Sequence, residues 1–473
     1  MRGRTVRLRV VLVIIVAVVL IAVGGTIAYV VLVPGTSTTP TQVHSGPAVC
    51  SSADEENPGG NWTTYHRDNV RSGVEPSSNV TGVHPLWSGP TAVDADVYAE
   101  PLVCGNSVYV ATEDNTVYAV NVSTGTVIWH THLGTPVTSS TLPCGDIAPT
   151  TGITGTPVID TATGILYAVA FLSPHQHVLF GLNVANGSVV SQVGVDPAGA
   201  DPMVEQQRGA LTLANGYVYL VYGGLDGDCG DYHGWVVGVP VSGSGGLVSY
   251  QVPTQREGGI WGTGGMGVAA NGTLYVATGN GASTTTFDHG DAVIELSPTL
   301  TEIAYFAPTN WVQLNEQDTD LGSVAPTVLP NGEIFQIGKG GVGYLLSGTH
   351  LGGIGGQVSE TNVCNGAYGG TAHEGYSIFV PCLDGVFDVV ANATNLSVVW
   401  QTNGFDAGSP IVTGNIVWSV DISNAKLLGF NITNGDQLFS FPLGSVDHFV
   451  SPAAAPGALY VGAGSQLYAF DLE

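Results

Sequence analysis

Seven side chains that could take part in chemistry stand directly before apolar, strand-like stretches of the sequence. Carboxylates and imidazoles can transfer protons, a guanidinium can hold an anion, oxygen atoms can bind a cation, and an indole can stack on a ring. Each could equally be a structural group at a strand start, so chemistry requires a fold that gathers several of them. The seven are Glu100, Arg208, Trp261, Asp320, His373, Asp406 and His448.

Motifs for several other chemistries are missing or stand in the wrong context. The six cysteines contain no C-x-x-C spacing, which argues against c-type haem attachment and a zinc ribbon. The letters G-x-G-x-x-G from Gly262 to Gly267 lie within strand-like repeats, without the helix that a dinucleotide site needs. Gly338-Lys339-Gly340 lacks the Ser or Thr of a phosphate-binding loop, and neither G-x-S-x-G nor H-E-x-x-H occurs.

The charge of the chain excludes one class of partner. Acidic residues number 37 against 10 basic ones, and the formal net charge is −27. Four of the basic residues, all arginines, lie within the first nine positions, so the rest of the chain carries 37 acids against 6 bases. A surface of this sign repels phosphate backbones, and we therefore expect no nucleic acid partner.

An uncharged run of 24 residues (10–33) follows the arginines. At about 1.5 Å per residue a helix of this length spans roughly 36 Å, enough to cross a bilayer. The basic flank predicts a cytoplasmic tail (1–9), one transmembrane helix (10–33) and an extracytoplasmic remainder. Residues 34–60, rich in Pro, Thr, Ser and Gly, are predicted to form a stalk. The alternative is a cleaved signal peptide, whose apolar region would be about 7–15 residues long.

The cysteines and the glycosylation sequons suit an exterior location. Six cysteines in an oxidising compartment predict three disulfides, with Cys364–Cys382 as our preferred pair. Eight Asn-x-Ser/Thr sequons predict a glycoprotein, although the same letters also suit the turns of a repeated strand unit.

From about residue 99 the sequence repeats one unit, made of strands with alternating polarity, a polar hairpin, a Gly turn and a strand that ends in Trp. The clearest copy is VYVATEDNTVYAVNVSTGTVIW at 108–129. One aromatic residue marks the second strand of each copy, and successive markers are 39 to 60 residues apart, a period typical of β-propeller blades. The markers are Tyr109, Tyr167, Tyr219, Tyr275, Phe335, Phe379, Trp418 and Tyr460.

This pattern predicts an all-β protein in which residues 61–473 form an eight-bladed β-propeller of four-stranded antiparallel blades. Seven blades are the alternative, because the repeats across 190–360 are diffuse. The last copy ends after its third strand, so a strand at about 82–90 is predicted to close the last blade. Inner strands of a propeller line a central funnel, where the seven side chains would converge, and the funnel is therefore the expected ligand site.

The phrase Y-A-V-N-x-x-T-G-x-x-x-W in these copies resembles the repeat of pyrroloquinoline-quinone-type (PQQ) propellers, the quinoprotein alcohol dehydrogenase-like superfamily. The resemblance covers about residues 62–473 and includes NWTTYHRDNVRSGV at 61–74. Dehydrogenases of this superfamily hold the quinone over a Trp and beside a Ca²⁺ bound by an acid, an Asn and an Asp, with a Lys nearby. They cap the quinone with two adjacent cysteines, and no such pair occurs in this sequence.

The resemblance implies candidates for the cofactor-binding residues. Trp261 in GGIWGTGG lies near the position of the Trp beneath the quinone, and an inner-strand packing role is its alternative. Lys339 in GKGGVGYLL resembles the lysine that touches the quinone, and an ion pair with Asp320 is the competing explanation. Arg208, at a blade start, is a further cofactor-binding candidate.

The resemblance also implies a calcium site. Asn280 in ATGNG and Asp320 in DTDLGS match two of the family's ligands, and Asp228 lies where the remaining acidic ligand is carried. A separate loop calcium site or a solvated acidic turn would explain Asp228 as well. In an enzyme, Ca²⁺ would polarise the quinone and Asp320 would act as the general base.

Two functions follow from these observations. The first is a membrane-anchored binding or scaffolding propeller without catalysis, whose partner is an extracellular protein, a glycan or a small molecule in the funnel. The anchor, the stalk and the missing cysteine pair favour it. The alternative is a PQQ- and calcium-dependent dehydrogenase that oxidises alcohols or sugars.

Overall fold

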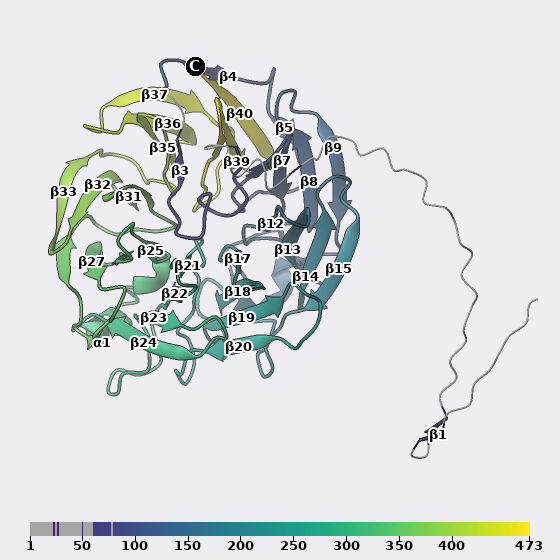
Figure 1. Cartoon of the computed structure of the whole chain (residues 1–473), viewed down its shortest axis with the longest axis vertical. Coiled ribbons are helices and arrows are strands. Elements are labelled where there is room, and N and C mark those ends of the chain that lie inside the picture. The colour runs from purple at the N-terminus through teal and green to yellow at the C-terminus, as the bar shows by residue number, and fades with distance from the viewer. Residues whose placement is uncertain (1–21, 24–25, 28–49, 51–59, 77–78) are drawn as a thin grey trace, which may run out of the picture. The chain divides into compact units, whose positions relative to one another are not determined.

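The computed structural model describes residues 22–23, 26–27, 50, 60–76 and 79–473. The chain divides into two compact units, Met1–Pro47 and Ala48–Glu473. In the second unit, eight antiparallel sheets of four or five strands follow one another around a central axis (Figure 1). The eight-bladed propeller is therefore confirmed, and the seven-bladed alternative is wrong.

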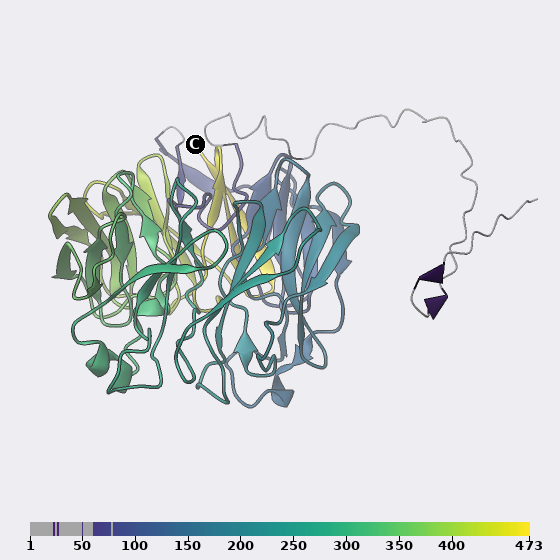
Figure 2. The same ribbon diagram turned by 60° about the horizontal axis from the view of Figure 1, so that its bottom comes forward.

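Each blade begins with a short inner strand and ends with an outer strand at the rim (Figure 1), and the tilted view shows the blades standing side by side (Figure 2). The first four blades are β6 (Leu102–Cys104), β7 (Ser107–Ala111), β8 (Thr116–Asn121) and β9 (Val127–His132); β12 (Val158–Asp160), β13 (Ile165–Leu172), β14 (Gln176–Asn183) and β15 (Val189–Gly194); β17 (Thr212–Ala214), β18 (Tyr217–Gly224), β19 (Trp235–Pro240) and β20 (Val248–Gln251); and β21 (Gly267–Val268), β22 (Leu274–Ala277), β23 (Val293–Leu296) and β24 (Glu302–Ala307).

The other four blades complete the ring. They are β25 (Thr327–Val328), β26 (Ile334–Gln336), β27 (Val342–Leu346) and β29 (Ser359–Asn362); β30 (Ala372–Glu374), β31 (Ser377–Cys382), β32 (Gly385–Asn392) and β33 (Asn395–Gln401); β34 (Ile411–Thr413), β35 (Ile416–Asp421), β36 (Lys426–Asn431) and β37 (Gln437–Pro442); and β38 (Ala453–Ala455), β39 (Ala458–Ala463), β40 (Gln466–Leu472) and β4 (Val83–Pro85).

Short additional elements extend several blades. β16 (Glu205–Gln206) pairs with β18, β5 (Thr91–Ala92) pairs with β40, β28 (Gly353–Ile354) lies parallel to β24, and β3 (Val74–Glu75) lies parallel to β34. β10 (Val137–Thr138) and β11 (Thr150–Thr151) form a small hairpin, and α1 (Trp311–Glu316) is a short helix. Within the described part of the chain, Ser139–Thr141 and Leu321–Ser323 form 3-10 turns.

The aromatic markers explain why the count of blades is readable from the sequence. All eight lie on the second strand of a blade, and every one of them is buried. Several also connect blades, because Tyr219 Oη donates a hydrogen bond to Pro298 O at 2.7 Å and Tyr109 Oη donates to Val184 O at 3.2 Å. The period is visible because each blade needs a large side chain at the same place against its neighbour.

The Trp that ends the repeat phrase contacts the Gly turn of the following blade. Trp129 Nε1 donates to Val184 O at 3.0 Å, and Trp400 Nε1 donates to Ile432 O at 2.9 Å. A Cβ on Gly187 would lie 2.5 Å from the Trp129 ring, and one on Gly435 would lie 2.6 Å from Trp400. Trp87, which follows β4, stands in the same way against Gly125 of the first blade. Glycine is required there because the ring occupies the space of a side chain.

The N-terminal strand closes the ring. β4 pairs with β40 through Val83↔Leu472, His84↔Asp471 and Pro85↔Phe470. Thr81 N donates to Glu473 O at 2.6 Å and Leu86 N donates to Ala469 O at 2.9 Å, which lengthens the contact on both sides. The last blade therefore has no unpaired third strand exposed to another chain.

Residues 62–75, named the plug here, run around the axis inside the ring. The plug contacts the inner strands of blades one to seven in order, through its main chain at six of them and through the Thr64 side chain at the third. The contacts are Trp62 N to Val103 O, Ile159 N to Thr63 O, Thr64 Oγ1 to Leu211 O, Val268 N to Asn69 O, Val328 N to Val70 O, His373 N to Ser72 O and Val412 N to Gly73 O, at 2.7–3.3 Å. The inner strands would otherwise present unpaired edges to the channel.

A buried guanidinium holds the turn of the plug. Arg71 is 2% exposed, and its nitrogens donate to Met266 O at 3.0 Å, Tyr65 O at 3.0 Å and Thr212 Oγ1 at 2.7 Å. The Arg71 guanidinium also lies 5.9 Å from the centre of the Tyr65 ring. Burial lowers the pKa of Arg71 to about 10, so the group stays charged at neutral pH.

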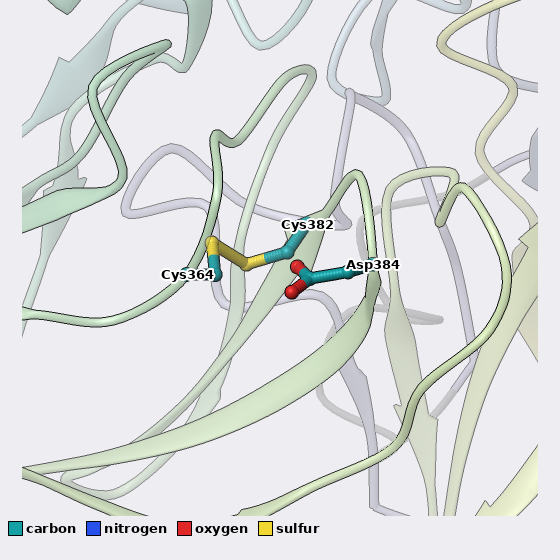
Figure 3. Close-up of side chains that lie close together, drawn as sticks. All are labelled: Cys364, Cys382 and Asp384. Atoms are coloured by element: carbon teal, nitrogen blue, oxygen red, sulfur yellow. A yellow bond between two sulfur atoms is a disulfide. The ribbon is translucent and has the colours of Figure 1, made fainter.

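Three disulfides are present, Cys50–Cys104, Cys144–Cys229 and Cys364–Cys382, which confirms the predicted number and the preferred pair. Cys364 follows β29 and Cys382 ends β31, so this bridge joins two neighbouring blades, with Asp384 beside it (Figure 3). Cys50–Cys104 ties the end of the predicted stalk to the inner strand of the first blade.

The N-terminal predictions concern the first unit. The predicted tail, most of the predicted transmembrane segment and nearly all of the stalk lie outside the described residues. Within the predicted span, β1 (Ala22–Val23) and β2 (Thr26–Ile27) pair as antiparallel strands. The described residues contain no helix long and apolar enough to cross a bilayer.

The contact between Trp129 and Gly187 yields a prediction about stability. Gly187 and Gly216 both have a positive φ, of 70° and 78°, but a Cβ on Gly216 would meet nothing within 4 Å. We expect Gly216→Ala to cost roughly 1–2 kcal/mol for the left-handed backbone alone. Gly187→Ala should cost about 1–3 kcal/mol more, because the Trp129 ring must move. Denaturant unfolding of both variants measures the difference, and equal costs would contradict the role of the ring.

Candidate functional site

A cavity of about 370 Å³ opens at one end of the central channel. Most of its wall consists of segments that lead into inner strands or that follow second strands, and these ends meet on one side of the ring because the strands are antiparallel. The side chains that line it are Asp146, Arg208, Leu225, Asp226, Asp228, Tyr232, Trp261, Asp318, Asp320, Lys339, Tyr368 and Phe449. We refer to this cavity as the central pocket.

Lys339, Asp320 and Trp261 form a cluster on one wall of the central pocket. Lys339 Nζ lies 2.8 Å from Asp320 Oδ2 and 3.0 Å from Asp318 Oδ1, and 5.4 Å from the centre of the Trp261 ring. The N–H of Asn280 donates to Asp320 Oδ1 at 2.8 Å. Burial alone lowers the pKa of Lys339, but the two carboxylates outweigh burial and raise the pKa above its usual value. Lys339 is therefore charged, and both oxygens of Asp320 are engaged.

Arg208 forms a second charged cluster. Its Nη2 donates to Asp146 Oδ1 and to Gln206 Oε1, each at 3.1 Å, and its guanidinium lies 5.5 Å from the centre of the Phe449 ring. His448 Nε2 lies 3.1 Å from Asp146 Oδ2. Burial and the charge of Arg208 lower the pKa of His448 to about 4, so this imidazole is neutral at pH 7.

A disulfide fixes the acidic wall of the central pocket. Cys144–Cys229 joins the loop that carries Asp146 to the loop that follows β18 and carries residues 225–228. Tyr232 Oη donates to Asp228 Oδ1 at 2.5 Å, which orients that carboxylate. The side chain of Asp226 is exposed. These acids therefore belong to loops that a covalent bond holds together.

Four aromatic side chains line the central pocket, and three of them, Trp261, Tyr368 and Phe449, pack against one another. The rings of Tyr368 and Phe449 stack with centres 6.0 Å apart and an angle of 15° between their planes. The centre of the Trp261 ring lies 6.3 Å from that of Tyr368 and 6.2 Å from that of Phe449. Phe449 adopts a φ of 66°, an uncommon backbone conformation for a bulky residue that its packing must hold in place.

The structure gathers several of the predicted site residues. Arg208, Trp261, Asp320 and Lys339 line the central pocket together, as does Asp228. Asn280 stands behind Asp320, with its side-chain amide 3.5 Å from Glu257 Oε2. The ion pair between Lys339 and Asp320, which the sequence offered as an alternative, is present.

Other predicted funnel residues lie elsewhere. Glu100 is buried beneath the plug, His373 N donates to Ser72 O of the plug, and Asp406 lies outside the lining of the central pocket. The expectation that all seven polar residues converge is thus wrong, because the plug fills part of the channel. Sequence reasoning also missed Asp146, Tyr368 and Phe449, and only the pairing of Cys144 with Cys229 could have indicated Asp146.

Comparisons with known proteins agree with this architecture. Residues 84–224 match a family model described as outer membrane protein assembly factor BamB. Quinohemoprotein alcohol dehydrogenase ADHIIG from Pseudomonas putida HK5 aligns with 90% of this chain and 82% of its own, at a TM-score of 0.70 and 14% identity. The chain has the fold of the PQQ-like propellers.

Two further structures show how broad this fold is. A europium-containing methanol dehydrogenase aligns with 89% of this chain and 99% of its own, at a TM-score of 0.67 and 14% identity. BamB from Moraxella catarrhalis aligns with 83% of this chain and 98% of its own, at a TM-score of 0.54 and 12% identity. A search of curated proteins finds no match to the sequence. The dehydrogenases and BamB are thus similar to this chain in fold alone.

The side chains of the central pocket do not fit a calcium-bound quinone. Both oxygens of Asp320 are taken by Lys339 and by the N–H of Asn280, and Asp228 is bound to Tyr232. Among the described residues, clusters of three metal-ligating side chains of the Asp, Glu, His and Cys types occur at Cys364/Cys382/Asp384 and His84/Asp471/Glu473, and neither lines the central pocket. Calcium prefers six to eight oxygen ligands, and the carboxylates of Asp320 and Asp228, the two expected acidic ligands, already have other partners.

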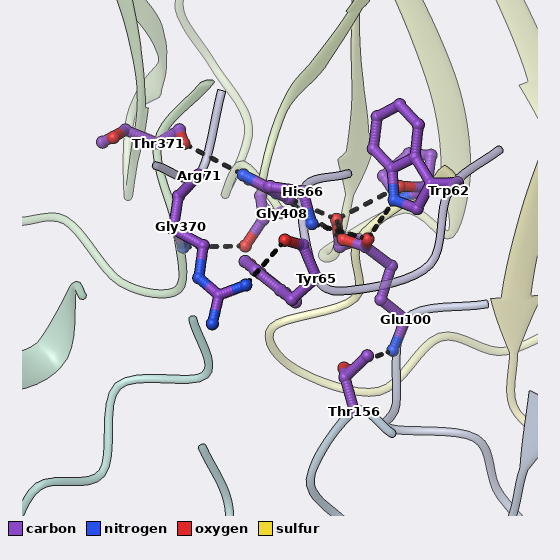
Figure 4. Close-up of polar contacts among 12 residues, drawn as sticks. Trp62, Tyr65, His66, Arg71, Glu100, Thr156, Gly370, Thr371 and Gly408 are labelled. Carbon is purple, nitrogen blue, oxygen red and sulfur yellow. Dashed lines mark hydrogen bonds and ion pairs between the residues drawn. The ribbon is translucent and has the colours of Figure 1, made fainter. Parts of the chain in front are cut away.

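Glu100 is the centre of a buried network of polar contacts (Figure 4). Trp62 Nε1 donates to Glu100 Oε1 at 2.5 Å, and the N–H of His66 donates to the same oxygen at 2.8 Å. Ser451 Oγ lies 2.5 Å from Glu100 Oε2 and 3.2 Å from His66 Nε2. Burial raises the pKa of Glu100 to about 8 and lowers the pKa of His66 to about 3.

Burial favours a proton on Glu100, because a pKa of about 8 leaves most of this carboxyl group neutral at pH 7. His66 Nδ1 lies 2.9 Å from the carbonyl oxygen of Thr371, so Nδ1 carries the hydrogen and Nε2 of the neutral ring can accept. Ser451 Oγ donates to Glu100 Oε2 at 2.5 Å, and its contact with His66 Nε2 is longer, at 3.2 Å. The hydrogen bonds from Ser451, Trp62 and the N–H of His66 favour the ionised form, and burial outweighs them.

A protonated Glu100 makes stability depend on pH. Its folded pKa of about 8 exceeds the ordinary value of 4.5, so the folded state holds the proton more tightly and the free energy of unfolding falls as pH rises to about 8. Glu100→Gln keeps the hydrogen bonds without titrating. We expect the stability of this variant relative to wild type to rise between about pH 6.5 and pH 8, by at most about 1.4 kcal/mol per pH unit.

Urea unfolding at several pH values above about 6.5 tests this, because the titration of His66 is common to the variant and wild type and cancels in the difference. Glu374→Gln removes an exposed carboxyl group and is the matched control, whose pH dependence should follow wild type. Parallel pH profiles for Glu100→Gln and wild type would show that Glu100 is already ionised in the folded protein.

Proposed function

We propose that this chain is a non-catalytic binding module, held at the outer side of a membrane by its N-terminal apolar segment, with its ligand site in the central pocket. The observation that carries the proposal is the commitment of Asp320 to Lys339 and to the N–H of Asn280. A general base must accept a proton from substrate, and an ion-paired carboxylate with both oxygens engaged is a poor acceptor. The missing adjacent-cysteine cap of the dehydrogenases supports the same conclusion.

The proposed location rests on the sequence and the disulfides. Three disulfides favour an oxidising compartment, and the run at 10–33 with its basic flank favours a retained single-pass anchor. The sequons would then carry glycans on the exposed surface. The small-molecule ligand in the central pocket is the partner we favour, with an extracellular protein or a glycan as the other candidates.

The alternative is a PQQ- and calcium-dependent dehydrogenase acting on alcohols or sugars. The fold shared with ADHIIG and with the europium-containing methanol dehydrogenase favours it, as does the presence of Trp261 and Lys339 in one cavity. The cofactor would have to displace Lys339, which would break its contacts with both Asp320 and Asp318.

Titration of the full chain with PQQ and Ca²⁺ separates these functions. We expect no stoichiometric binding in optical spectra and no dye reduction with simple alcohols or sugars. Asp320→Ala should change stability without changing this result, because the carboxylate has a structural role. Stoichiometric cofactor binding with turnover that Asp320→Ala abolishes would establish the dehydrogenase instead.

Removal of residues 1–33 tests the anchor. We expect the full chain to sediment with membranes and to resist extraction by high salt, and the shortened chain to remain in the supernatant. N-terminal sequencing of the mature protein is the second measurement. A mature chain that begins after residue 33 would show that the apolar segment is a cleaved signal peptide.

A further inference from the structure

We propose that the ligand of the central pocket is a small organic cation, an ammonium or guanidinium compound. This inference rests on the proposed function and names its ligand class. It follows from the balance of charge around the cavity, from the rings that line it and from the covalently held loops that carry its acids.

The lining of the central pocket carries more negative charge than its own cations neutralise. Five carboxylates face two basic side chains. The charge of Arg208 is neutralised by Asp146, and that of Lys339 by Asp320. Asp318 also contacts Lys339 and adds a further negative charge. Asp226 and Asp228 have no basic side chain among the lining residues to neutralise them. A bound cation would restore neutrality in a cavity whose apolar walls strengthen electrostatic attraction.

Asp226 and Asp228, the acids without a basic counterpart, lie on a loop that a disulfide and hydrogen bonds hold in place. The Cys144–Cys229 bridge joins their loop to the loop of Asp146, and Arg256 Nη2 donates to Asp228 O at 2.9 Å. Asp228 adopts a φ of 51°, and Tyr232, 3% exposed, orients its carboxylate. A simple solvated turn would need neither the bridge nor the hydrogen bond from a buried phenol.

The rings offer surfaces that already accept cations. Lys339 lies over Trp261 and Arg208 lies over Phe449, at 5.4 and 5.5 Å from the ring centres. Tyr368 packs against both rings, and among the described residues no cation lies over it. A ligand with a cationic group and an apolar body could place its charge towards the acids and its body on this ring.

The same features disfavour other ligand classes. A quinone with several carboxylates would bring negative charge into a wall that holds five acids, and inorganic anions would meet the same repulsion. A neutral polyol would leave the excess charge unpaired. The cavity volume of about 370 Å³ equals the share of about twelve water molecules at roughly 30 Å³ each, which suits a compound of small size.

Calorimetry of the full chain with choline and with agmatine tests the inference. The control ligand is 3,3-dimethylbutan-1-ol, the uncharged carbon analogue of choline. We expect at least one cation to bind with an affinity about tenfold or more above that of the uncharged analogue. This binding should weaken as the NaCl concentration rises from about 20 to about 200 mM.

Three variants locate the binding. Asp226→Asn and Asp228→Asn should each weaken the cation about threefold to tenfold, because each removes one negative charge from the wall. Asp226 is exposed, so its variant remains informative if Asp228→Asn unfolds. Asp231→Asn changes an exposed acid in the same loop that does not line the central pocket, and should leave the affinity unchanged.

The possible outcomes separate this inference from the proposed function. The proposal of a cationic ligand is overturned if choline and its uncharged analogue bind with equal affinity, or if neither cation binds. The protein would then remain a binding module for another ligand. Weakening by Asp231→Asn as strong as by Asp226→Asn also overturns the site. Binding of PQQ with Ca²⁺ and turnover overturns both proposals together.

Discussion

The inner strands of a propeller have edges that face the central channel, and their N–H groups must find partners there. In this chain the plug supplies partners, because its backbone contacts the first, second and fourth to seventh blades in turn and its side chains contact the third. Arg71 and Glu100 then hold the plug through hydrogen bonds to groups that water cannot reach. The closed channel, the position of the central pocket and the neutral state of Glu100 all depend on this arrangement.

Contacts between neighbouring blades repeat the same combination of ring packing and hydrogen bonding. A Trp at the end of one blade packs on the glycine turn of the next and donates its indole N–H to a carbonyl there. The turn therefore needs both a positive φ and the absence of a side chain, which only glycine provides. The aromatic residues on the second strands add hydrogen bonds between the same neighbours. The ring closes when β4 brings Trp87 against the first blade.

The central pocket differs from the rest of the channel in its charge. Ion pairs engage Lys339, Arg208, Asp320 and Asp146, so the groups that could have bound a metal or abstracted a proton already have partners. The features left for a ligand are the acidic wall, on loops joined by Cys144–Cys229, and the aromatic rings that line the pocket. Such a surface can recognise a molecule without reacting with it, which is why a dehydrogenase-like fold can serve as a binding module.

The sequence by itself predicted eight blades, with seven as the alternative, together with the marker aromatics and the closing strand region, because each blade repeats the same local pattern of strands, turns and packing residues. It also placed Arg208, Trp261 and Asp320 near one another through the shared ends of strands, and the family resemblance added Lys339, with an ion pair to Asp320 as one of its two explanations. The tertiary structure alone decided that the plug buries Glu100 and that a disulfide joins the loops of Asp146 and Asp228. Contacts between distant blades leave no periodic trace, since each is made once and depends on the geometry of the closed ring.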